Sequence, residues 1–291
     1  MKAGFVTIIG RPNVGKSTLM NSIIGENLSI VSKKPNTTRV SINGIKTTKD
    51  YQIIFFDTPG IHNAKDKINK MMVATSINYI SVANVIYYLI DPFESICGQT
   101  KRILQILKDI QIPKLLLINK IDISSKEQVL KTAKTVYEAG RFTYVLPVSA
   151  LKKINITELE KITVEFLPES EIFYDSDIIT TNDNKLLIAE FVREQIYKLL
   201  NEEVPYEILV ICKKLEEREN LLSAAVEIVV NRDSQKGIVI GKNGKILKEI
   251  GVNARKKIEY FYGCKVYLDL WVKIINNWQI NDEYLKIQGL I

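Results

Sequence analysis

The feature that most constrains the fold is an octapeptide near the N-terminus, Gly10-Arg11-Pro12-Asn13-Val14-Gly15-Lys16-Ser17. An apolar run from Gly4 to Ile9, typical of a buried parallel strand, precedes it, and a helical pattern of apolar residues follows it. In the pattern G-x-x-x-x-G-K-S, backbone N–H groups surround a β-phosphate, the lysine contacts the β- and γ-phosphates, and the hydroxyl holds Mg²⁺. This strand–loop–helix context predicts a P-loop fold that binds a nucleoside triphosphate.

A second motif, Asn119-Lys120-Ile121-Asp122, indicates which base is bound. It follows Lys114–Ile118, a run that is apolar after its first residue and is typical of a central parallel strand. A carboxylate at Asp122 can accept hydrogen bonds from N1–H and N2–H₂ of guanine, and adenine lacks this donor pair. Asn119 is expected to bridge the base and the phosphate loop, and the Lys120 stem to cover the ring. Alone, the tetrapeptide also fits a strand end whose polar residues cap a helix; downstream of a phosphate loop it predicts guanine.

Three further segments complete the predicted site. Asp57-Thr58-Pro59-Gly60 follows the strand-like run Tyr51–Phe56; Asp57 is expected to hold Mg²⁺ through water, and the Gly60 N–H to contact the γ-phosphate. In the polar stretch 35–39, Thr38 is expected to complete the Mg²⁺ shell when GTP is bound, with Thr37 as the alternative. Ser149-Ala150-Leu151, after the run 144–148, is expected to pack its backbone against guanine.

These motifs resemble the GTPase domain of the translation-factor class and, more narrowly, the Era GTPase family. The resemblance rests on G-R-P-N-V-G-K-S, P-N-T-T-R, D-T-P-G, N-K-I-D and S-A-L-K-K-I-N. The chain departs from the family at Asn36, where most members have Gln. The resemblance implies a GTP hydrolase with Mg²⁺ as cofactor, whose nucleotide state controls binding of the 3′ end of small-subunit ribosomal RNA during assembly of the 30S subunit.

The residues expected to act on GTP come from these segments. The predicted Mg²⁺ ligands are Ser17, Thr38 and Asp57, and the predicted catalytic groups are Lys16, Asn13, Thr38 and Gly60. The whole predicted nucleotide-binding set is Gly10, Arg11, Pro12, Asn13, Val14, Gly15, Lys16, Ser17, Asp57, Thr58, Pro59, Gly60, Ile61, Asn119, Lys120, Ile121, Asp122, Ser149 and Ala150.

The residue after Gly60 bears on how water is activated. Ras-type enzymes carry a glutamine there that orients the attacking water, whereas this chain carries Ile61, which neither donates nor accepts hydrogen bonds. The adjacent His62 is an alternative base. Otherwise the charge that develops between the β- and γ-phosphates must be met by Lys16, Mg²⁺ and a further cation held by Asn13. The resemblance suggests K⁺ for that cation, and slow basal hydrolysis.

The second half of the chain has a different organisation. After a helical pattern at Ile156–Leu167, the run Pro168-Glu169-Ser170-Glu171 opens a polar stretch to about Asn184. We therefore predict a GTPase domain at 1–167, a linker at 168–184, an α+β domain at 185–275 and a tail at 276–291. The first domain should be α/β, with a mixed, mostly parallel sheet and helices on both faces. The second reads helix (185–201), strand (206–214), strand (224–230), short helix (an apolar turn at 237–240), helix and strand (265–272).

Gly241-Lys242-Asn243-Gly244 lies between the last two predicted helices. A G-x-x-G loop there lets a nucleotide backbone approach closely and is the clamp of K-homology (KH) domains for single-stranded nucleotides. From Arg232 to Lys265 there are nine Lys/Arg and three acidic residues, an excess of +6. A solvated helix face with a glycine turn is the alternative; helix order and charge favour RNA, with DNA as a further option. The predicted RNA-binding residues are Gly241, Lys242, Asn243, Gly244, Lys245 and Lys248. The helix-first order resembles the type-2 KH domain that follows the GTPase domain in the Era family.

Composition limits the number of domains, the kind of partner and the redox compartment. The chain has 291 residues, 46% hydrophobic and 25% charged, which suits two globular domains, and its net charge of +7 permits an anionic partner. The odd, scattered cysteines Cys97, Cys212 and Cys264 argue for a reducing compartment. We expect a cytoplasmic monomer, and the resemblance implies loose association with the inner face of the cell membrane. The lone Trp278 is expected to pack against its domain, and Gln279 replaces the family's usual basic residue.

Two alternatives for the function stay open at this stage. The chain fits a related GTPase that acts on a different RNA. It also fits a non-catalytic RNA-binding checkpoint, in which GTP is a ligand and turnover is incidental.

Overall fold

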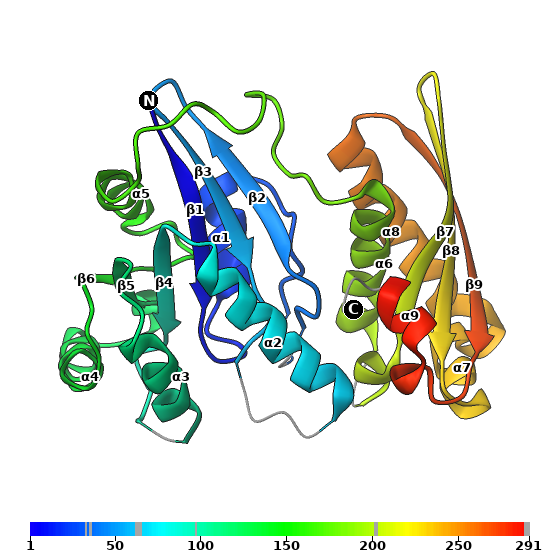
Figure 1. The fold of residues 1–291 in the computed structure, drawn as a ribbon. Helices are drawn as coiled ribbons and strands as arrows, with labels where there is room; N and C mark the ends of the chain where they lie inside the picture. The colour runs from blue at the N-terminus through cyan, green and yellow to red at the C-terminus, as the bar shows by residue number, and fades with distance from the viewer. Residues whose placement is uncertain (33, 35–36, 62–65, 97, 201–202, 288–291) are drawn as a thin grey trace. The chain divides into compact units, whose positions relative to one another are not determined.

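The structure is a computed structural model that describes residues 1–291 apart from 33, 35–36, 62–65, 97, 201–202 and 288–291. Pro35, Asn36, His62 and Cys97 therefore lie outside the described residues. The chain divides into two compact units, Met1–Thr181 and Asn182–Ile291, which are described separately below (Figure 1).

The first unit is built on a sheet with the strand order β2-β3-β1-β4-β5-β6. Only β2 runs antiparallel to its neighbour, β3; the other neighbouring strands are parallel. Every residue of β4 and of β5 is buried, as expected for strands covered on both faces. The strands are β1 (Lys2–Ile9), β2 (Ile42–Thr47), β3 (Tyr51–Asp57), β4 (Val85–Ile90), β5 (Lys114–Ile118) and β6 (Tyr144–Pro147).

Helices cover both faces of this sheet because successive strand side chains point to opposite sides. On β4, Tyr88 packs in a buried cluster with residues of α2, α3 and α4, whereas the Tyr87 hydroxyl hydrogen-bonds Thr163 of α5. This arrangement confirms the predicted mixed, mostly parallel sheet with helices on both faces. The helices are α1 (Lys16–Ile24), α2 (Lys67–Ser81), α3 (Gly98–Lys108), α4 (Lys126–Ala139) and α5 (Ile156–Glu165).

Most of the segment predicted as a linker is hydrogen-bonded to the first unit. The buried Gln52 side chain on β3 accepts from the backbone N–H groups of Phe173 and Tyr174 and donates to the Tyr174 carbonyl, at 2.7–3.1 Å. On β2, the Asn43 amide oxygen accepts from the Thr181 N–H at 2.8 Å. The division between the units accordingly falls after Thr181, inside the predicted stretch 168–184.

The second unit follows the predicted order of helix, strand, strand, helix, helix, strand. Its sheet has the order β7-β8-β9, with β7 antiparallel and β9 parallel to β8, and α6 and α8 lie on one face (Figure 1). The turn expected at 237–240 is the last part of a longer helix that begins at Asp233, because the polar first turn hides its periodicity. The elements are α6 (Asn184–Leu199), β7 (Leu209–Arg218), β8 (Leu221–Val230), α7 (Asp233–Ile240), α8 (Lys245–Tyr262), β9 (Lys265–Ile274) and α9 (Asp282–Ile287).

The C-terminal segment is anchored by Trp278. Its side chain is fully buried, and its indole N–H donates to the Glu207 carbonyl at 2.8 Å. Trp278 therefore packs within the second unit, as predicted. In the part of the chain that is described, no helix is long and apolar enough to cross a bilayer.

Candidate functional site: a nucleotide pocket and a G-x-x-G loop

The motifs of the first unit meet where the parallel strands end. The segment 10–17 follows β1, Asp57 ends β3 and Asn119 follows β5, so all three lie at the carboxyl edge of the sheet. Gly15 caps α1 with φ of 102°, and a Cβ there would stand 2.3 Å from the Asn119 side-chain nitrogen. The backbone conformation and this close neighbour both require glycine at position 15. The loop therefore places the N-terminus of α1 at the site.

Lys16 is the buried cation of the pocket. Its ammonium donates to the Gly10 carbonyl at 3.3 Å and to the Arg11 carbonyl at 3.1 Å, so neutral groups satisfy it. Burial lowers the pKa of Lys16 to about 8, although the Asp57 carboxylate nearby opposes this shift. A phosphate in the loop would stabilise the ammonium form, which couples the charge of Lys16 to nucleotide binding.

Three oxygen-bearing side chains converge beside Lys16. The Ser17 hydroxyl donates to Asp57 Oδ2 at 2.6 Å, and its oxygen lies 3.0 Å from Thr38 Oγ1. Asp57 is fully buried, and its Oδ1 has no hydrogen-bond partner among the described residues. Burial raises the pKa of Asp57, while Lys16 and the Ser17 hydroxyl act in the opposite direction. Mg²⁺ in nucleotide sites is held by a small number of protein oxygens, and phosphates and water fill the rest of its shell. The oxygens of Ser17, Thr38 and Asp57 fit that ion.

The structure separates the two threonines that the sequence left open. The Thr37 hydroxyl donates to the Lys34 carbonyl at 2.7 Å, which commits it to its own loop. Thr38 instead places its hydroxyl oxygen beside Ser17. This geometry favours Thr38 as the Mg²⁺ ligand.

The base-recognition segment is held by hydrogen bonds to the phosphate loop. Asn119 donates to the Val14 carbonyl at 2.8 Å and accepts from the Ala150 N–H at 2.9 Å, which joins three segments. Lys120 donates to the Asn13 carbonyl at 2.7 Å. The Asp122 carboxylate accepts from the Ser149 hydroxyl at 2.6 Å, which fixes its orientation at the pocket. The Asp122 carboxylate thus lines the pocket on the segment that follows β5.

A pocket of about 620 Å³ occupies this edge of the first unit. Its volume lies within the range of small-molecule sites. The predicted residues that line it are Pro12, Asn13, Gly15, Lys16, Ser17, Thr38, Gly60, Asn119, Lys120 and Asp122. Leu151, which was predicted to lie at the base together with Ser149 and Ala150, also lines the pocket. No sequence pattern indicated Thr18, Ile30, Val31, Ser32 or Ile123, and Thr37 was expected only as an alternative. Several of these are apolar and carry no motif, so nothing marked them as a lining for a base or ribose.

Two predicted residues direct their side chains elsewhere. Arg11 forms an ion pair with Glu94 at 3.2 Å and a hydrogen bond to Gln99, so only its backbone faces the phosphate loop. Ile61 is 1% exposed within the buried cluster on the α2–α4 face, and its N–H donates to the Gly10 carbonyl at 3.2 Å. The Ile61 side chain therefore neither lines the pocket nor positions water. The remaining predicted residues support the pocket without lining it: Gly10, Val14, Asp57, Thr58, Pro59, Ile121, Ser149 and Ala150.

In the second unit, the G-x-x-G segment forms a sharp loop between α7 and α8. Gly241, Asn243 and Gly244 all have positive φ, at 71°, 54° and 74°. Lys242, Asn243, Lys245 and Lys248 are exposed. The loop thus presents the N-terminus of α8 and the exposed lysines Lys242, Lys245 and Lys248 to solvent. This arrangement suits a nucleic-acid backbone.

A shallow groove of about 400 Å³ runs beside this loop along α8 and β9. Lys248 and Arg255 supply its charge, and Leu247, Leu268 and Leu270 supply apolar surface. Single-stranded bases need such apolar surface next to cations. Of the predicted residues, Gly244 and Lys248 line the groove; Leu247, Gly251, Val252, Arg255, Leu268 and Leu270 were not predicted to contact RNA.

The fold and the two sites define the class of the protein: a P-loop GTPase joined to a KH domain. Family models agree, since one described as a 50S ribosome-binding GTPase matches residues 5–120 and a KH-domain model matches residues 193–279. The GTPase Era of Clostridium kluyveri is 44% identical over 290 residues, which cover 99% of each chain. The chain belongs to the Era family of GTPases and is a GTP hydrolase, as the motifs predicted.

Solved structures agree over the whole length. Era in complex with MgGDPNP and nucleotides 1506–1542 of 16S ribosomal RNA is similar with a TM-score of 0.95 and 40% identity, covering 100% of this chain and 99% of that one. A point variant of Aquifex aeolicus Era bound to GDP and AlF₄⁻ gives the same TM-score, identity and coverage. The predicted fold class is therefore confirmed in both halves of the chain.

Proposed function

We propose that this GTPase uses its nucleotide state to control binding of single-stranded ribosomal RNA. In the first unit, Lys16 contacts the β- and γ-phosphates and the Gly60 N–H contacts the γ-phosphate. Asp122 reads the guanine edge, and Asn119 holds the base-recognition segment to the phosphate loop. The observation that carries this assignment is the convergence of the Ser17, Thr38 and Asp57 oxygens beside the buried ammonium of Lys16.

Mg²⁺ held by Ser17, Thr38 and, through water, Asp57 would supply positive charge to the phosphates. The chain itself contributes a pocket in which the buried Lys16 ammonium stabilises the negative charge that develops on the phosphates during hydrolysis. Because Ile61 cannot orient water as a glutamine does, Asn13 in the phosphate loop would hold a further cation that offsets the developing charge, and the family resemblance suggests K⁺. This mechanism gives slow basal hydrolysis.

The RNA arm of the proposal rests on the second unit. Gly241–Gly244 clamps four nucleotides, Lys242, Lys245 and Lys248 meet their phosphates, and the apolar groove receives bases. The relative solved with nucleotides 1506–1542 of 16S ribosomal RNA supports the 3′ end of small-subunit RNA as ligand and assembly of the 30S subunit as process. We further propose a cytoplasmic monomer with peripheral association at the inner face of the membrane.

A single-turnover assay separates this proposal from a non-catalytic checkpoint. GTP hydrolysis is measured with a stoichiometric excess of the full chain, with and without an RNA that carries the 3′ end of 16S ribosomal RNA. A GTPase regulated by RNA hydrolyses GTP at a rate that depends on that RNA. Equal, negligible rates in both arms would favour the checkpoint. Crosslinking in cells and sequencing of bound RNA identifies the ligand, and recovery of an unrelated RNA would redirect the proposal.

A further inference from the structure

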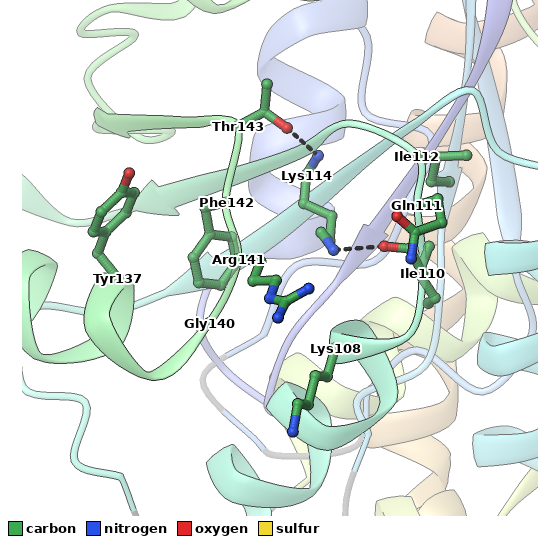
Figure 2. Close-up of a pocket in the computed structure, with 10 residues that line it drawn as sticks. All are labelled: Lys108, Ile110, Gln111, Ile112, Lys114, Tyr137, Gly140, Arg141, Phe142 and Thr143. Carbon is green, nitrogen blue, oxygen red and sulfur yellow. Dashed lines mark hydrogen bonds between the residues drawn. The ribbon is translucent and has the colours of Figure 1, made fainter.

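A second hollow lies at the opposite end of β5 from the nucleotide pocket. Lys114 begins this strand and Asn119 follows its end, so the two sites are on opposite edges of the sheet. The hollow has a volume of about 470 Å³ and lies where α3 and α4 end (Figure 2). None of the residues that carry GTP chemistry lines it, so the established activity does not explain it.

Three cations line this hollow: Lys108, Lys114 and Arg141. No Asp or Glu is present among the described residues that line it. Lys114 is buried, and its ammonium donates to the carbonyls of Leu107 at 3.0 Å and Ile110 at 2.6 Å. Both acceptors are neutral, and no carboxylate among the described lining residues offsets the positive charge of Lys114. Figure 2 shows the Arg141 guanidinium on the same side of the hollow as the Lys114 ammonium, with the Lys108 side chain extending below.

The simplest alternative role for these cations is to offset the negative ends of two helices. Lys108 is in the last turn of α3, and Arg141 follows the end of α4 by two residues. A helix C-terminus is equivalent to about half a negative charge, so two ends contribute roughly −1 against three unit cations. A surplus of about +2 remains after both helix ends are offset. Helix capping alone therefore does not account for the cluster.

The environment of Lys114 also indicates that the hollow suits an anion. Burial lowers the pKa of Lys114, and the positive charge of Arg141 lowers it further. An anion in the hollow would relieve both effects, because it would stabilise the ammonium and screen the repulsion between the two cations.

Size and aromatic lining narrow the class of anion. The volume exceeds the need of a single inorganic anion and lies within the range of small-molecule sites. Tyr137 on α4 is half exposed, and the Phe142 ring lies between Tyr137 and Arg141 in Figure 2. An exposed aromatic ring that lines the same hollow as the cations suits a base attached to a phosphate. Gln111 offers an exposed amide at the same hollow.

We propose that the hollow binds a nucleotide unit, with its phosphate against Arg141 and Lys108 and its base against Tyr137. The same chemistry comes from a free mononucleotide or from one residue of a single-stranded RNA. This inference does not depend on the RNA role of the second unit.

The test follows the backbone amides of Gly140 and Thr143 by NMR in the full chain, with the GTP pocket saturated by Mg²⁺ and GDP. The probes are uridine monophosphate, a short uridine oligoribonucleotide and inorganic phosphate. Saturable shifts at these amides are expected with a nucleotide probe. Binding of the oligomer alone assigns the site to RNA, and binding of the monophosphate as well assigns it to nucleotides in general. Inorganic phosphate should bind more weakly, and equal affinity would overturn the role of Tyr137.

Two variants make the test specific. Arg141→Gln removes an exposed cation and should weaken binding roughly tenfold or more, as expected for a charge-assisted contact. Lys131→Gln removes an equal charge from an exposed position on α4 that does not line the hollow, and it should leave affinity within about twofold. Dispersed amide spectra check that both variants fold. Absence of shifts with every nucleotide probe, or equal affinity of Arg141→Gln and the parent chain, would overturn the proposal.

Discussion

The nucleotide pocket and the G-x-x-G loop are built in opposite ways for their proposed ligands. In the pocket, polar side chains are fixed by hydrogen bonds: Asn119 joins the backbone of the phosphate loop to that of Ala150, and the Ser149 hydroxyl orients Asp122. At the loop, the backbone has positive φ angles, the lysines are exposed, and a groove lined by both leucines and cations lies alongside. A site of fixed, buried hydrogen bonds distinguishes one base from another, whereas exposed cations follow a phosphate backbone whatever its sequence. Four changes test this contrast.

The largest effect is expected at the base-reading carboxylate. Asp122→Asn replaces an acceptor by a donor, which mismatches guanine and suits the carbonyl of xanthine. GTP affinity should fall by at least about 10²-fold, since a site built for hydrogen bonds rejects a mispaired partner strongly. Titration with GTP and with xanthosine triphosphate measures the exchange. Asp177→Asn, an exposed change outside the pocket, is the control. Unchanged GTP affinity of Asp122→Asn would refute the guanine assignment.

The second largest effect, a loss of RNA affinity, is expected at the G-x-x-G loop. Gly244→Asp places a negative charge where a phosphate must lie, and RNA affinity should fall on the order of tenfold or more while basal GTP turnover stays near that of the parent. Gly263→Asp is a matched control. Both glycines have positive φ, 74° and 66°, with nothing within 4 Å of an added Cβ, but Gly263 lies at the far end of α8. Equal loss of RNA binding in the two variants would indicate strain and not a clamp.

A smaller effect is expected from the monovalent cation. Hydrolysis should be several-fold to roughly tenfold faster in K⁺ than in Na⁺ at equal ionic strength, because a positioned cation meets charge between the β- and γ-phosphates. Asn13→Ala should remove most of this difference and leave GTP bound. Since Asn13 has φ of 64°, Asn13→Gly repeats the test without backbone strain. Identical rates of the parent chain in the two salts would exclude the cation and direct attention to His62 or to a partner.

The smallest catalytic effect is expected at Ile61. Ile61→Ala should change the rate of hydrolysis by less than about twofold, since the side chain is buried in the core and does not reach the pocket. The same change should lower the free energy of unfolding by about 2–4 kcal/mol, because it leaves a cavity. Denaturant unfolding and single-turnover kinetics on the same samples measure both. A large loss of rate in folded protein would give Ile61 a role in the chemistry.

The contrast between the two sites also explains what the sequence could predict. Lys114–Ile118 was predicted to its residue bounds because a fully buried parallel strand is a continuous apolar run, and the polar motifs follow directly from such runs. The order of elements in the second unit was read correctly for a similar reason: its long α8 repeats apolar residues every three or four positions.

Other features depend on tertiary contacts that no local pattern records. Val31 and Ile123 line the nucleotide pocket, but isolated apolar residues outside the strands and long helices carry no pattern that marks them. The side chain of Arg11 looks like a phosphate ligand in the sequence, whereas its position is decided by Glu94, which is distant along the chain. The groove beside Lys248 depends on Leu268 and Leu270 from β9. Only the fold brings these residues together.

The hydrogen bonds of Gln52 and Asn43 set where the chain can be cut. Gln52 is fully buried and relies on the backbone of Phe173 and Tyr174 for its partners. A fragment that stops at Leu167, where the helical pattern ends, would leave this amide without them, at a cost of about 1–3 kcal/mol for each unsatisfied group. A fragment that continues through Thr181 retains every one of these bonds. The stretch that looks like a tether in the sequence is therefore, in large part, the outermost layer of the GTPase domain itself.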